Sequence, residues 1–280
     1  MPAATTLDWI VRRLHRIVLD QPFHPSALDR SKRKPPTMET KCIQDIYDPQ
    51  FVKGVFDRCS SRYRYWSQIA SFGFVFLWRR QCVDRMPAMP STEVTGLDVM
   101  AGTGEAWPYL LRRRENITSI TAVDISSGMI RRAIERLHRS RIDKIKVIEA
   151  DVLQNTLPAA SADFVVCTFG LKTLSSAQQR LFAKELVRVL KRGGVLSLIE
   201  ASDPKGWVLH GLYRFYLDRV LPLVEKFVLR GAQDFAMIGV YTRNFGDCRF
   251  MAQCLAEEGL DVEFKAFFFG CATGVVGRKP

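Results

Sequence analysis

The sequence predicts an α/β fold built on a mostly parallel, doubly wound sheet. From about residue 93 onward, short runs rich in Val and Ile alternate with segments of helical periodicity. This order favours parallel strand pairing. The first run ends in a glycine-rich turn, and an acidic residue ends the next one. The length of 280 residues suits one large α/β domain or two small ones.

Each element follows from its local pattern, in chain order. Runs rich in β-branched residues predict strands over Glu93–Met100, Ser119–Val123, Ile145–Ala150, Asp163–Cys167 and Gly194–Ile199. Apolar residues at helical spacing between them predict helices over Trp107–Arg114, Gly128–Arg139 and Ala177–Lys191. The pattern then changes, and we expect helices over Trp207–Leu229 and Asp247–Glu258, then a closing strand pair over Val262–Phe268 and Cys271–Val276.

The N-terminal segment differs in composition from the rest of the chain. Residues 1–37 carry seven basic and three acidic residues, and apolar residues from Leu7 to Val18 fall at helical spacing. We expect a basic amphipathic helix there, either on a membrane surface or packed on the main domain. A linker over Ser31–Pro36 follows. The prediction is therefore an extension over 1–37 and a main domain over 38–280, with helical cap segments at about 50–90 and 204–245.

Composition and charge limit the class of protein. Hydrophobic residues make up 47% and charged residues 25%, which excludes a disordered, collagen-like or coiled-coil chain. The net charge of +12 favours anionic partners such as nucleic acid, an acidic membrane surface or a phosphorylated substrate. Seven cysteines without a CxxC pair or zinc spacing indicate reduced, mostly buried thiols, and no metal site is expected.

The cellular location is predicted from the absence of two kinds of segment. No apolar run approaches the ~20 residues that span a bilayer, and the first residues lack the layout of a secretory signal. We therefore expect a cytoplasmic protein that is either soluble or peripheral on the inner face of a membrane. Asp8 and Asp20 disfavour a transit peptide without excluding one, so an organellar matrix is the alternative.

The segment Leu97–Glu105 is the most informative part of the chain. Gly102 and Gly104 remove Cβ atoms at a strand-to-helix turn, where the backbone must bend sharply and approach a ligand closely. Asp124 ends the next strand, where a carboxylate accepts hydrogen bonds from ribose hydroxyls. Asp151 follows the third strand, where it suits an adenine amino group.

This spacing fits two kinds of nucleotide ligand. A dinucleotide fold usually carries G-x-G-x-x-G, but Trp107 stands in place of the third glycine. Adenine, ribose and a small zwitterion without phosphates describe S-adenosylmethionine (SAM) better than NAD. A dinucleotide and a purely structural glycine turn remain the alternatives. The expected cofactor residues are Asp98, Ala101, Gly102, Thr103, Gly104, Asp124, Ile125, Asp151, Val152 and Thr168.

These motifs resemble a class I SAM-dependent methyltransferase, and within that superfamily the ubiquinone/menaquinone C-methyltransferase (UbiE-type) family. The resemblance covers roughly residues 50–280. Its blocks include Val55–Arg58, Ser71–Gly73, Leu77–Arg80, Phe169–Leu171, Arg188–Gly194, Ile199–Ser202, Tyr213–Tyr216, Val220–Leu223, Arg243–Phe245 and Ala272–Gly274. It implies a Rossmann-like, seven-stranded sheet with helical N-terminal and lid additions, SAM as the methyl donor and S-adenosylhomocysteine as the product.

The resemblance also implies a substrate class. The family methylates a ring carbon of a prenylated benzoquinol or naphthoquinol at a membrane surface. The family pattern R-Y-D with a following Asn is Arg62-Tyr63-Arg64 with Ser67 here, and F-G-L-R-N is Phe169-Gly-Leu-Lys-Thr173. Both changes lie where the resemblance places the substrate pocket, so it implies an intact SAM site with altered acceptor recognition.

Three side chains are candidates for catalysis: Tyr63, Lys172 and His210. A phenol ring carbon becomes nucleophilic when a neighbouring hydroxyl loses its proton, so a base, or a cation that stabilises phenolate, assists methyl transfer. Lys172 follows the fourth strand, at the sheet edge where ligands bind. Tyr63 is either a ligand contact or an ordinary half-buried tyrosine, and His210 is either a base or a packed histidine.

The leading hypothesis is methyl transfer from SAM to a ring carbon of a prenylated quinol or related aromatic. The alternatives are N- or O-methylation of a lipid or natural product, and a non-methylating SAM-binding subunit or cyclase. The basic run Arg131–Lys146 indicates a solvated helix face or an anionic membrane contact. Nucleic acid is disfavoured, since the fourth strand lacks the N/D-P-P-Y/F turn. The expected partners are a hydrophobic or lipid substrate and a homodimer or biosynthetic complex.

Overall fold

The computed structural model describes residues 45–89, 93–113, 116–223 and 236–280. The basic helix predicted within residues 1–37 lies outside the described residues, as do Cys42 and the end of the predicted helix Trp207–Leu229. The six described cysteines are buried free thiols, as expected.

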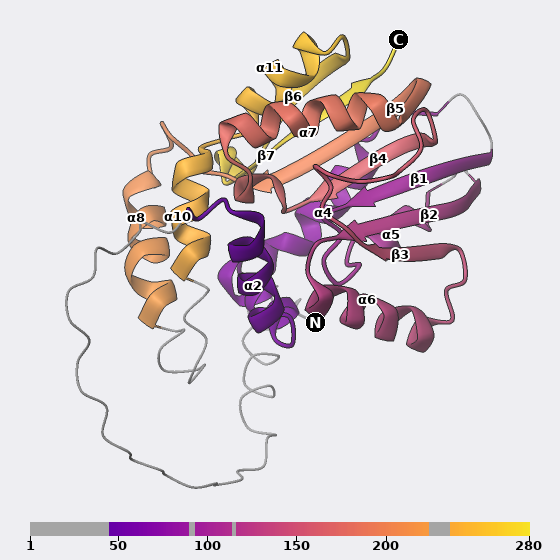
Figure 1. The fold of residues 1–280 in the computed structure, drawn as a ribbon. Coiled ribbons are helices and arrows are strands. Elements are labelled where there is room, and N and C mark those ends of the chain that lie inside the picture. The colour runs from indigo at the N-terminus through magenta and orange to yellow at the C-terminus, as the bar shows by residue number, and fades with distance from the viewer. Residues whose placement is uncertain (1–44, 90–92, 114–115, 224–235) are drawn as a thin grey trace, which may run out of the picture. The chain divides into compact units, whose positions relative to one another are not determined.

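The described chain folds around a seven-stranded sheet, drawn as arrows in Figure 1. The strand order is β3-β2-β1-β4-β5-β7-β6; β1 to β5 run parallel, and β7 is antiparallel to both of its neighbours. This order confirms the predicted fold class. The strands are β1 (Glu93–Val99), β2 (Asn116–Asp124), β3 (Ile145–Glu149), β4 (Ala162–Thr168), β5 (Leu190–Ala201), β6 (Asp261–Phe267) and β7 (Ala272–Arg278).

Helices cover both faces of the sheet and one of its ends. They are α2 (Pro49–Cys59), α3 (Tyr63–Ala70), α4 (Phe74–Asp84), α5 (Trp107–Leu110), α6 (Ser127–Ser140), α7 (Ser176–Val189), α8 (His210–Phe215), α10 (Ala236–Phe245) and α11 (Arg249–Glu257). Short turns are the 3-10 helices η1 (Leu171–Thr173) and η3 (Phe268–Gly270) and the π-helical η2 (Tyr216–Val220).

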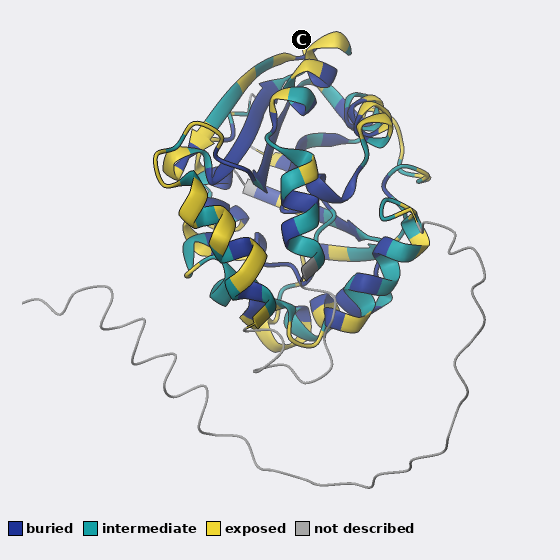
Figure 2. Cartoon of the chain, turned by 90° about the vertical axis from the view of Figure 1, so that its left-hand side faces the viewer, coloured by how far each residue is buried: buried dark blue, intermediate teal, exposed yellow. Residues whose placement is uncertain are grey.

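Two buried clusters hold these layers together. On one face of the sheet, α4, α5 and α6 pack side chains such as Trp78, Trp107 and Leu137 against the strands. On the other face, α7 and α11 contribute Phe182 and Met251. Figure 2 shows the buried strands between these more exposed helical layers. Burying each helix's apolar stripe against the sheet supplies most of the driving force for this arrangement.

Most predicted elements lie within a few residues of the observed ones, but two helices differ. The predicted helix Trp107–Arg114 is a single turn, α5, because only Trp107 and Leu110 need burial there. The helix predicted from Trp207 begins at His210, since Gly206, at φ +91°, takes part in a turn first. Its continuation is the π-helical η2. The short predicted strand Gly194–Ile199 is the centre of the longer β5.

The site of interest lies at the carboxyl ends of the parallel strands. Strand order reverses between β1 and β4, and such a switch point leaves a crevice outside the strand ends. In Figure 1, α2, α8 and α10 lie on the side toward which the arrows of β1 to β5 point. In the part of the chain that the structure describes, no helix is long and apolar enough to cross a membrane.

Candidate active site

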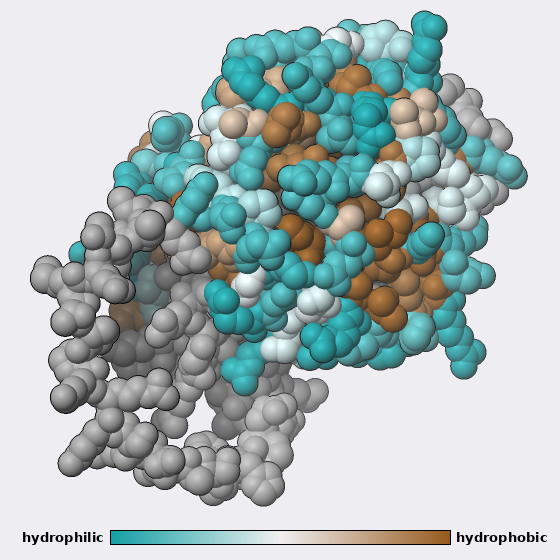
Figure 3. Space-filling view, viewed as in Figure 1, coloured by the Kyte–Doolittle hydropathy of each residue, from teal (hydrophilic) through white to brown (hydrophobic). Residues whose placement is uncertain are grey.

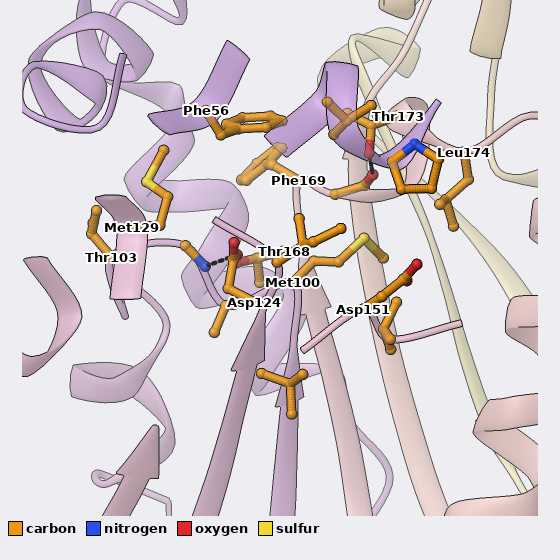
Figure 4. A pocket seen from close by; sticks show the side chains of 18 of the residues that line it. Phe56, Met100, Thr103, Asp124, Met129, Asp151, Thr168, Phe169, Thr173 and Leu174 are labelled. Carbon is orange, nitrogen blue, oxygen red and sulfur yellow. Dashed lines mark hydrogen bonds between the residues drawn. The ribbon is translucent and has the colours of Figure 1, made fainter. Parts of the chain in front are cut away.

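A cavity of about 850 Å³ occupies the crevice between the carboxyl ends of β1 to β4 and α2. Figure 4 shows Asp124, Thr168 and Asp151 beside the strand ends, with Phe56 and Phe169 across the cavity. The predicted cofactor residues that line it are Ala101, Gly102, Thr103, Asp124, Ile125, Asp151, Val152 and Thr168.

The glycine-rich turn has the conformation that the sequence predicts. Gly102 and Gly104 have φ of +57° and +73°, values that side chains with a Cβ rarely adopt. A Cβ on Gly102 would enter open space, so the backbone itself faces the cavity. Met100 and Phe169 also have positive φ, at +53° and +68°, and both line the cavity. Strained non-glycine backbone of this kind concentrates at functional sites.

Asp124 faces the cavity from the end of β2, where the sequence predicts a ribose contact. Its Oδ2 accepts a 2.8 Å hydrogen bond from the Gly102 N–H, and its Oδ1 accepts one of 2.9 Å from the Ser126 N–H. Each carboxylate oxygen can accept two hydrogen bonds, so each oxygen of Asp124 can still accept one from a hydroxyl donor. Burial raises the pKa of Asp124 to about 6, against the lowering effect of these two N–H donors.

Asp98 and Gly104 are the two predicted cofactor residues that do not line the cavity. Asp98 is fully buried, and its Oδ2 accepts a 2.9 Å hydrogen bond from Nε1 of Trp107. Burial raises the pKa of Asp98 to about 7, although this hydrogen bond lowers it. A Cβ on Gly104 would lie 2.4 Å from the Trp107 ring. Both residues therefore shape the glycine-rich turn without lining the cavity.

The remaining walls suit an adenine. Pro49, Val52 and Phe56 line the cavity from one face of α2, at the spacing of successive helical turns. Asp151 lies beyond β3, where its Oδ1 accepts a 2.9 Å hydrogen bond from the Leu153 N–H. Apolar walls for a purine, a carboxylate for its amino group and a second carboxylate for a ribose together fit SAM. SAM bound here would supply an electrophilic methyl group.

Among the cavity residues that sequence reasoning did not single out are two charged ones, Arg79 of α4 and Glu105 after the glycine turn. Arg79 is 3% exposed, and its Nη2 lies 2.6 Å from Oε2 of Glu105. Its guanidinium carbon lies 5.1 Å from the centre of the Phe169 ring. Glu105 ends the segment that carries the glycine motif, but no local pattern connects it to Arg79, which lies on a different element.

A second, more apolar cavity of about 1460 Å³ adjoins the first. Tyr63 and Phe169 line both cavities, so the two spaces meet at these side chains. Its walls come from α3, α4, α8, η2, α10 and η3, and they include Phe74, Trp78, Trp207, Leu212, Tyr213, Phe215, Tyr216, Leu217, Ile238 and Phe268. This space suits a large apolar ligand that carries an aromatic ring.

Lys172 is the cation of the second cavity. Its Nζ lies 2.5 Å from Oε1 of Glu200, which is fully buried, and its backbone N–H donates to Oε2 of the same carboxylate at 3.1 Å. A buried ion pair is tolerated only with such additional hydrogen bonds. Glu200 lies in the block Ile199–Ser202 but was not predicted as a site residue, because its pairing with Lys172 joins segments at the ends of β4 and β5.

The other two catalytic candidates differ in their placement. Tyr63 lies where the cavities meet, and burial raises its pKa well above the ordinary value, so its hydroxyl stays protonated at neutral pH. His210 lines neither cavity; its Nε2 lies 2.6 Å from Oδ1 of Asp203. Arg64, which stands where the family pattern has an aspartate, also lines neither cavity, and its Nε lies 3.9 Å from Oε1 of Glu105. Among the described residues, no group of three or more His, Cys, Asp or Glu could hold a metal ion.

Comparison of the chain with known sequences gives a consistent result. The model of the ubiE/COQ5 methyltransferase family matches residues 43–279. Demethylmenaquinone methyltransferase of Geobacillus kaustophilus is 27% identical over 230 residues, which are 81% of this chain and 96% of that protein. The ubiquinone/menaquinone biosynthesis C-methyltransferase UbiE of Hydrogenovibrio crunogenus is 27% identical over 226 residues, 80% of this chain and 86% of that protein.

Solved structures share the fold. A SAM-dependent methyltransferase of Thermotoga maritima, a possible histamine N-methyltransferase, is 19% identical with a TM-score of 0.55, covering 81% of this chain and 99% of that one. The cyclase SpnF is 15% identical with a TM-score of 0.52, covering 83% and 97%. With the cavity geometry and the family match together, the chain belongs to the ubiE/COQ5 methyltransferase family and is a SAM-dependent methyltransferase.

Proposed function

We propose that the protein transfers the methyl group of SAM to a ring carbon of a prenylated quinol or a related hydrophobic aromatic. The observation that carries the proposal is the junction of the two cavities at Tyr63 and Phe169. The first cavity fits the cofactor, and the second is apolar and larger. A ring lying at the junction would face the methyl donor, while its prenyl chain occupied the apolar space.

The named relatives support this acceptor class without determining it. The names of both relatives refer to the biosynthesis of quinones, but each is 27% identical to this chain. The residue after Phe169-Gly-Leu is Lys172 rather than the arginine of the family pattern, and a guanidinium and an ammonium hold oxygen atoms with different geometries. A quinol whose ring substituents differ from those of the relatives' substrates is therefore part of the proposal.

The residues at the junction supply the chemistry that ring methylation needs. The Lys172 ammonium stabilises a phenolate, which makes the neighbouring ring carbon nucleophilic. Glu200 holds that ammonium in place. The Tyr63 hydroxyl, which burial keeps protonated, is available to donate a hydrogen bond to the acceptor, and the aromatic walls limit the access of water to the developing charges. A bond forms between the ring carbon and the methyl carbon, and the S–CH3 bond breaks, which leaves S-adenosylhomocysteine. The ring carbon then loses its proton to solvent as the ring regains its aromaticity.

The experiment that tests this proposal incubates the purified protein with SAM and reduced prenylated benzoquinols and naphthoquinols. S-adenosylhomocysteine and the methylated product are measured by mass spectrometry, and NMR assigns the methylated atom. We expect a C-methylated quinol. A product methylated on oxygen, or turnover only with an amine lipid, would contradict the proposal in favour of O- or N-methylation.

Substitutions at Lys172 connect the activity to the junction. Lys172→Met is expected to lower kcat about 10²- to 10³-fold, the usual cost of removing one group that stabilises a developing oxyanion. Lys172→Arg should retain more activity because it keeps the charge. The control is Lys184→Met, since Lys184 is exposed on α7. Circular dichroism and the SAM dissociation constant separate lost chemistry from lost folding, and an active Lys172→Met enzyme would exclude the role of this lysine.

A further inference from the structure

A row of aromatic rings lines one wall of the second cavity and begins at its junction with the first. Phe169 lines both cavities, and the next ring centres follow at 6.3 Å for Trp78, 5.7 Å for Phe74 and 4.3 Å for Phe268. Phe169 and Trp78 are buried, whereas Phe268 is 44% exposed. The row therefore runs from the buried junction to the surface of the molecule.

The cation of this cavity lies at the buried end of the row. Nζ of Lys172 lies 5.9 Å from the centre of the Phe169 ring. Two tyrosine hydroxyls of the cavity are already paired, because Tyr213 donates to the Ser202 carbonyl at 3.2 Å and Tyr216 to the Ile69 carbonyl at 3.4 Å. An acceptor with an oxygen on its ring and an apolar chain would therefore place the ring beside Phe169 and the chain along the row.

Neighbouring rings fix the position of Phe268 at the exposed end of the row. Besides Phe74, its ring meets Trp207 at a centre distance of 6.2 Å, with the planes at 65°. Trp207 in turn stacks on Phe269, with the centres 5.5 Å apart and the planes at 4°. These contacts orient Phe268 and still leave almost half of it uncovered. A ligand chain that leaves the cavity here would bury the remaining apolar area.

The backbone of this turn supports a role for the ring. Phe268 and Phe269 have φ of +42° and +57°, in the left-handed region that favours glycine. A bulky residue there costs backbone energy, and such strain concentrates at ligand sites. Contacts of the two rings, rather than the preference of the backbone, therefore account for phenylalanine at these positions.

We propose that Phe268 determines specificity for the apolar side chain of the acceptor. It contacts the chain where the chain leaves the cavity, and so favours acceptors whose chain is long enough to reach it from the junction. The inference rests on the proposed function, because it needs an acceptor with a polar ring and an apolar chain. Phe268 does not line the cofactor cavity, so its contribution is to acceptor binding and not to methyl transfer.

The test measures acceptor binding without turnover. Naphthoquinols with no side chain and with prenyl chains of increasing length are titrated anaerobically into protein saturated with S-adenosylhomocysteine. Tryptophan fluorescence reports binding, since Trp78 and Trp207 line the cavity. In Phe268→Ala, affinity for the long-chain quinols should fall about three- to tenfold, the effect of losing one apolar contact, and affinity for the chainless quinol should stay within about twofold. In turnover assays, KM for the long-chain quinol should rise while kcat stays the same.

The matched control is Phe269→Ala, since Phe269 belongs to the same turn and lines neither cavity. Its affinity for long-chain quinols should stay near that of the wild type. Phe268→Leu should retain most of the affinity because it keeps an apolar side chain at the same position. If Phe268→Ala does not fold, Phe268→Gly provides the test, because glycine adopts the positive φ without strain.

The outcomes separate this inference from the proposed function. An equal loss in both alanine variants, an equal loss for quinols with and without a chain, or no loss in Phe268→Ala would overturn the role of Phe268 and leave the proposed function in place. If the wild type binds no quinol of any chain length, the proposed acceptor class is wrong, and the role of Phe268 fails with it.

Discussion

At the scale of single residues, the pKa of Asp124 is expected to make the affinity for SAM depend on pH. Ribose hydroxyls bind best to the ionised carboxylate, and burial raises its pKa to about 6. SAM affinity should therefore rise as pH increases from about 5 to 7, by at most about tenfold per pH unit below this pKa. The check is a series of calorimetric titrations across this range, which should show a lower dissociation constant at the higher pH.

Two substitutions assign this pH dependence to one residue. Asp124→Asn should bind SAM more weakly and with a nearly flat pH profile, because an amide does not ionise in this range. Asp98, with a pKa of about 7, lies behind the glycine turn, so Asp98→Asn should keep the slope near pH 6. A flat profile in Asp98→Asn instead would show that Asp98 causes the effect.

The same shift has the opposite sign for folding. A carboxyl group whose pKa is higher in the folded than in the unfolded state binds a proton more readily when folded. The contribution of Asp124 to stability therefore decreases as pH rises from about 4, its ordinary value, to about 6. Between about pH 4 and pH 6, the ligand-free protein loses the contribution of Asp124 to its stability. SAM affinity increases as the same carboxyl group ionises, so hydrogen bonds from the cofactor compensate for the cost of the buried charge.

At the scale of elements, Asp57 attaches α2 to the start of α6. Its Oδ1 accepts hydrogen bonds from the Ser126 hydroxyl at 2.6 Å and from the Gly128 N–H at 2.8 Å. Ser126 in turn caps α6 by accepting from the Met129 N–H at 3.1 Å. Because α2 lines the cofactor cavity through Phe56, this contact also holds one of its walls.

Replacing Asp57 should destabilise the fold in a pH-dependent way. Burial raises its pKa, but the hydrogen bonds from Ser126 and Gly128 outweigh this, so the net shift is downward. Asp57→Ala should lower the free energy of unfolding by about 1–3 kcal/mol at pH 7, the cost of losing hydrogen bonds to a charged group. A folded-state pKa below the unfolded value makes this stabilisation complete above about pH 4 and progressively lost as pH falls further.

Urea denaturation at pH 7 and at pH 3.5 measures both parts of this prediction. The difference between the wild type and Asp57→Ala should shrink at the lower pH. The control is Asp143→Ala, since Asp143 is exposed in the loop after α6 and should change little at either pH. If the free energies of unfolding of the wild type and Asp57→Ala differ by the same amount at both pH values, ionisation of Asp57 contributes nothing to stability.

At the scale of the whole molecule, exposed apolar side chains surround the second cavity. Leu212 and Phe215 of α8 are 64% and 57% exposed and also line that cavity, and Phe269 is 71% exposed beside it. Lys205 and Arg214 are exposed in the same region. Figure 3 shows a mostly hydrophilic face that carries several apolar patches.

We infer that this rim meets an anionic lipid surface, from which a prenylated acceptor would enter. The charge of +12 and continuity with the apolar cavity support a bilayer as the occupant. In sedimentation assays, vesicles containing phosphatidylglycerol should bind the protein more tightly than vesicles of phosphatidylcholine alone, and salt should weaken binding.

A pair of variants identifies the surface. Leu212→Ser combined with Phe215→Ser should reduce vesicle binding several-fold, since each side chain would bury apolar area in the interface. Leu181→Ser is the control, because Leu181 is 52% exposed on α7, which does not line the cavity. Equal binding by all three proteins would exclude this surface and direct attention to the basic face of α6. The homodimer and the biosynthetic complex remain predictions.

Local sequence patterns were sufficient for the fold class and for placing the glycine turn and Asp124 at one cavity. The glycine turn and Asp124 lie at the ends of adjacent parallel strands, and strand geometry brings such ends to one edge of the sheet. A strand–turn–helix unit therefore has nearly the same shape wherever it occurs. The same reasoning placed Lys172 at that edge, and the structure has it there.

Only the packed structure decided which distant groups meet. Glu200 binds Lys172 from the next strand, Arg79 reaches Glu105 from α4, and Asp98 turns to Trp107 instead of the cavity. These contacts form only when the helices and strands pack together. Packing removes water from both partners of each pair, which strengthens the interaction between them. The spacing of these residues along the chain does not predict the contacts, because in another fold the same residues at the same spacing would lie apart and bind water.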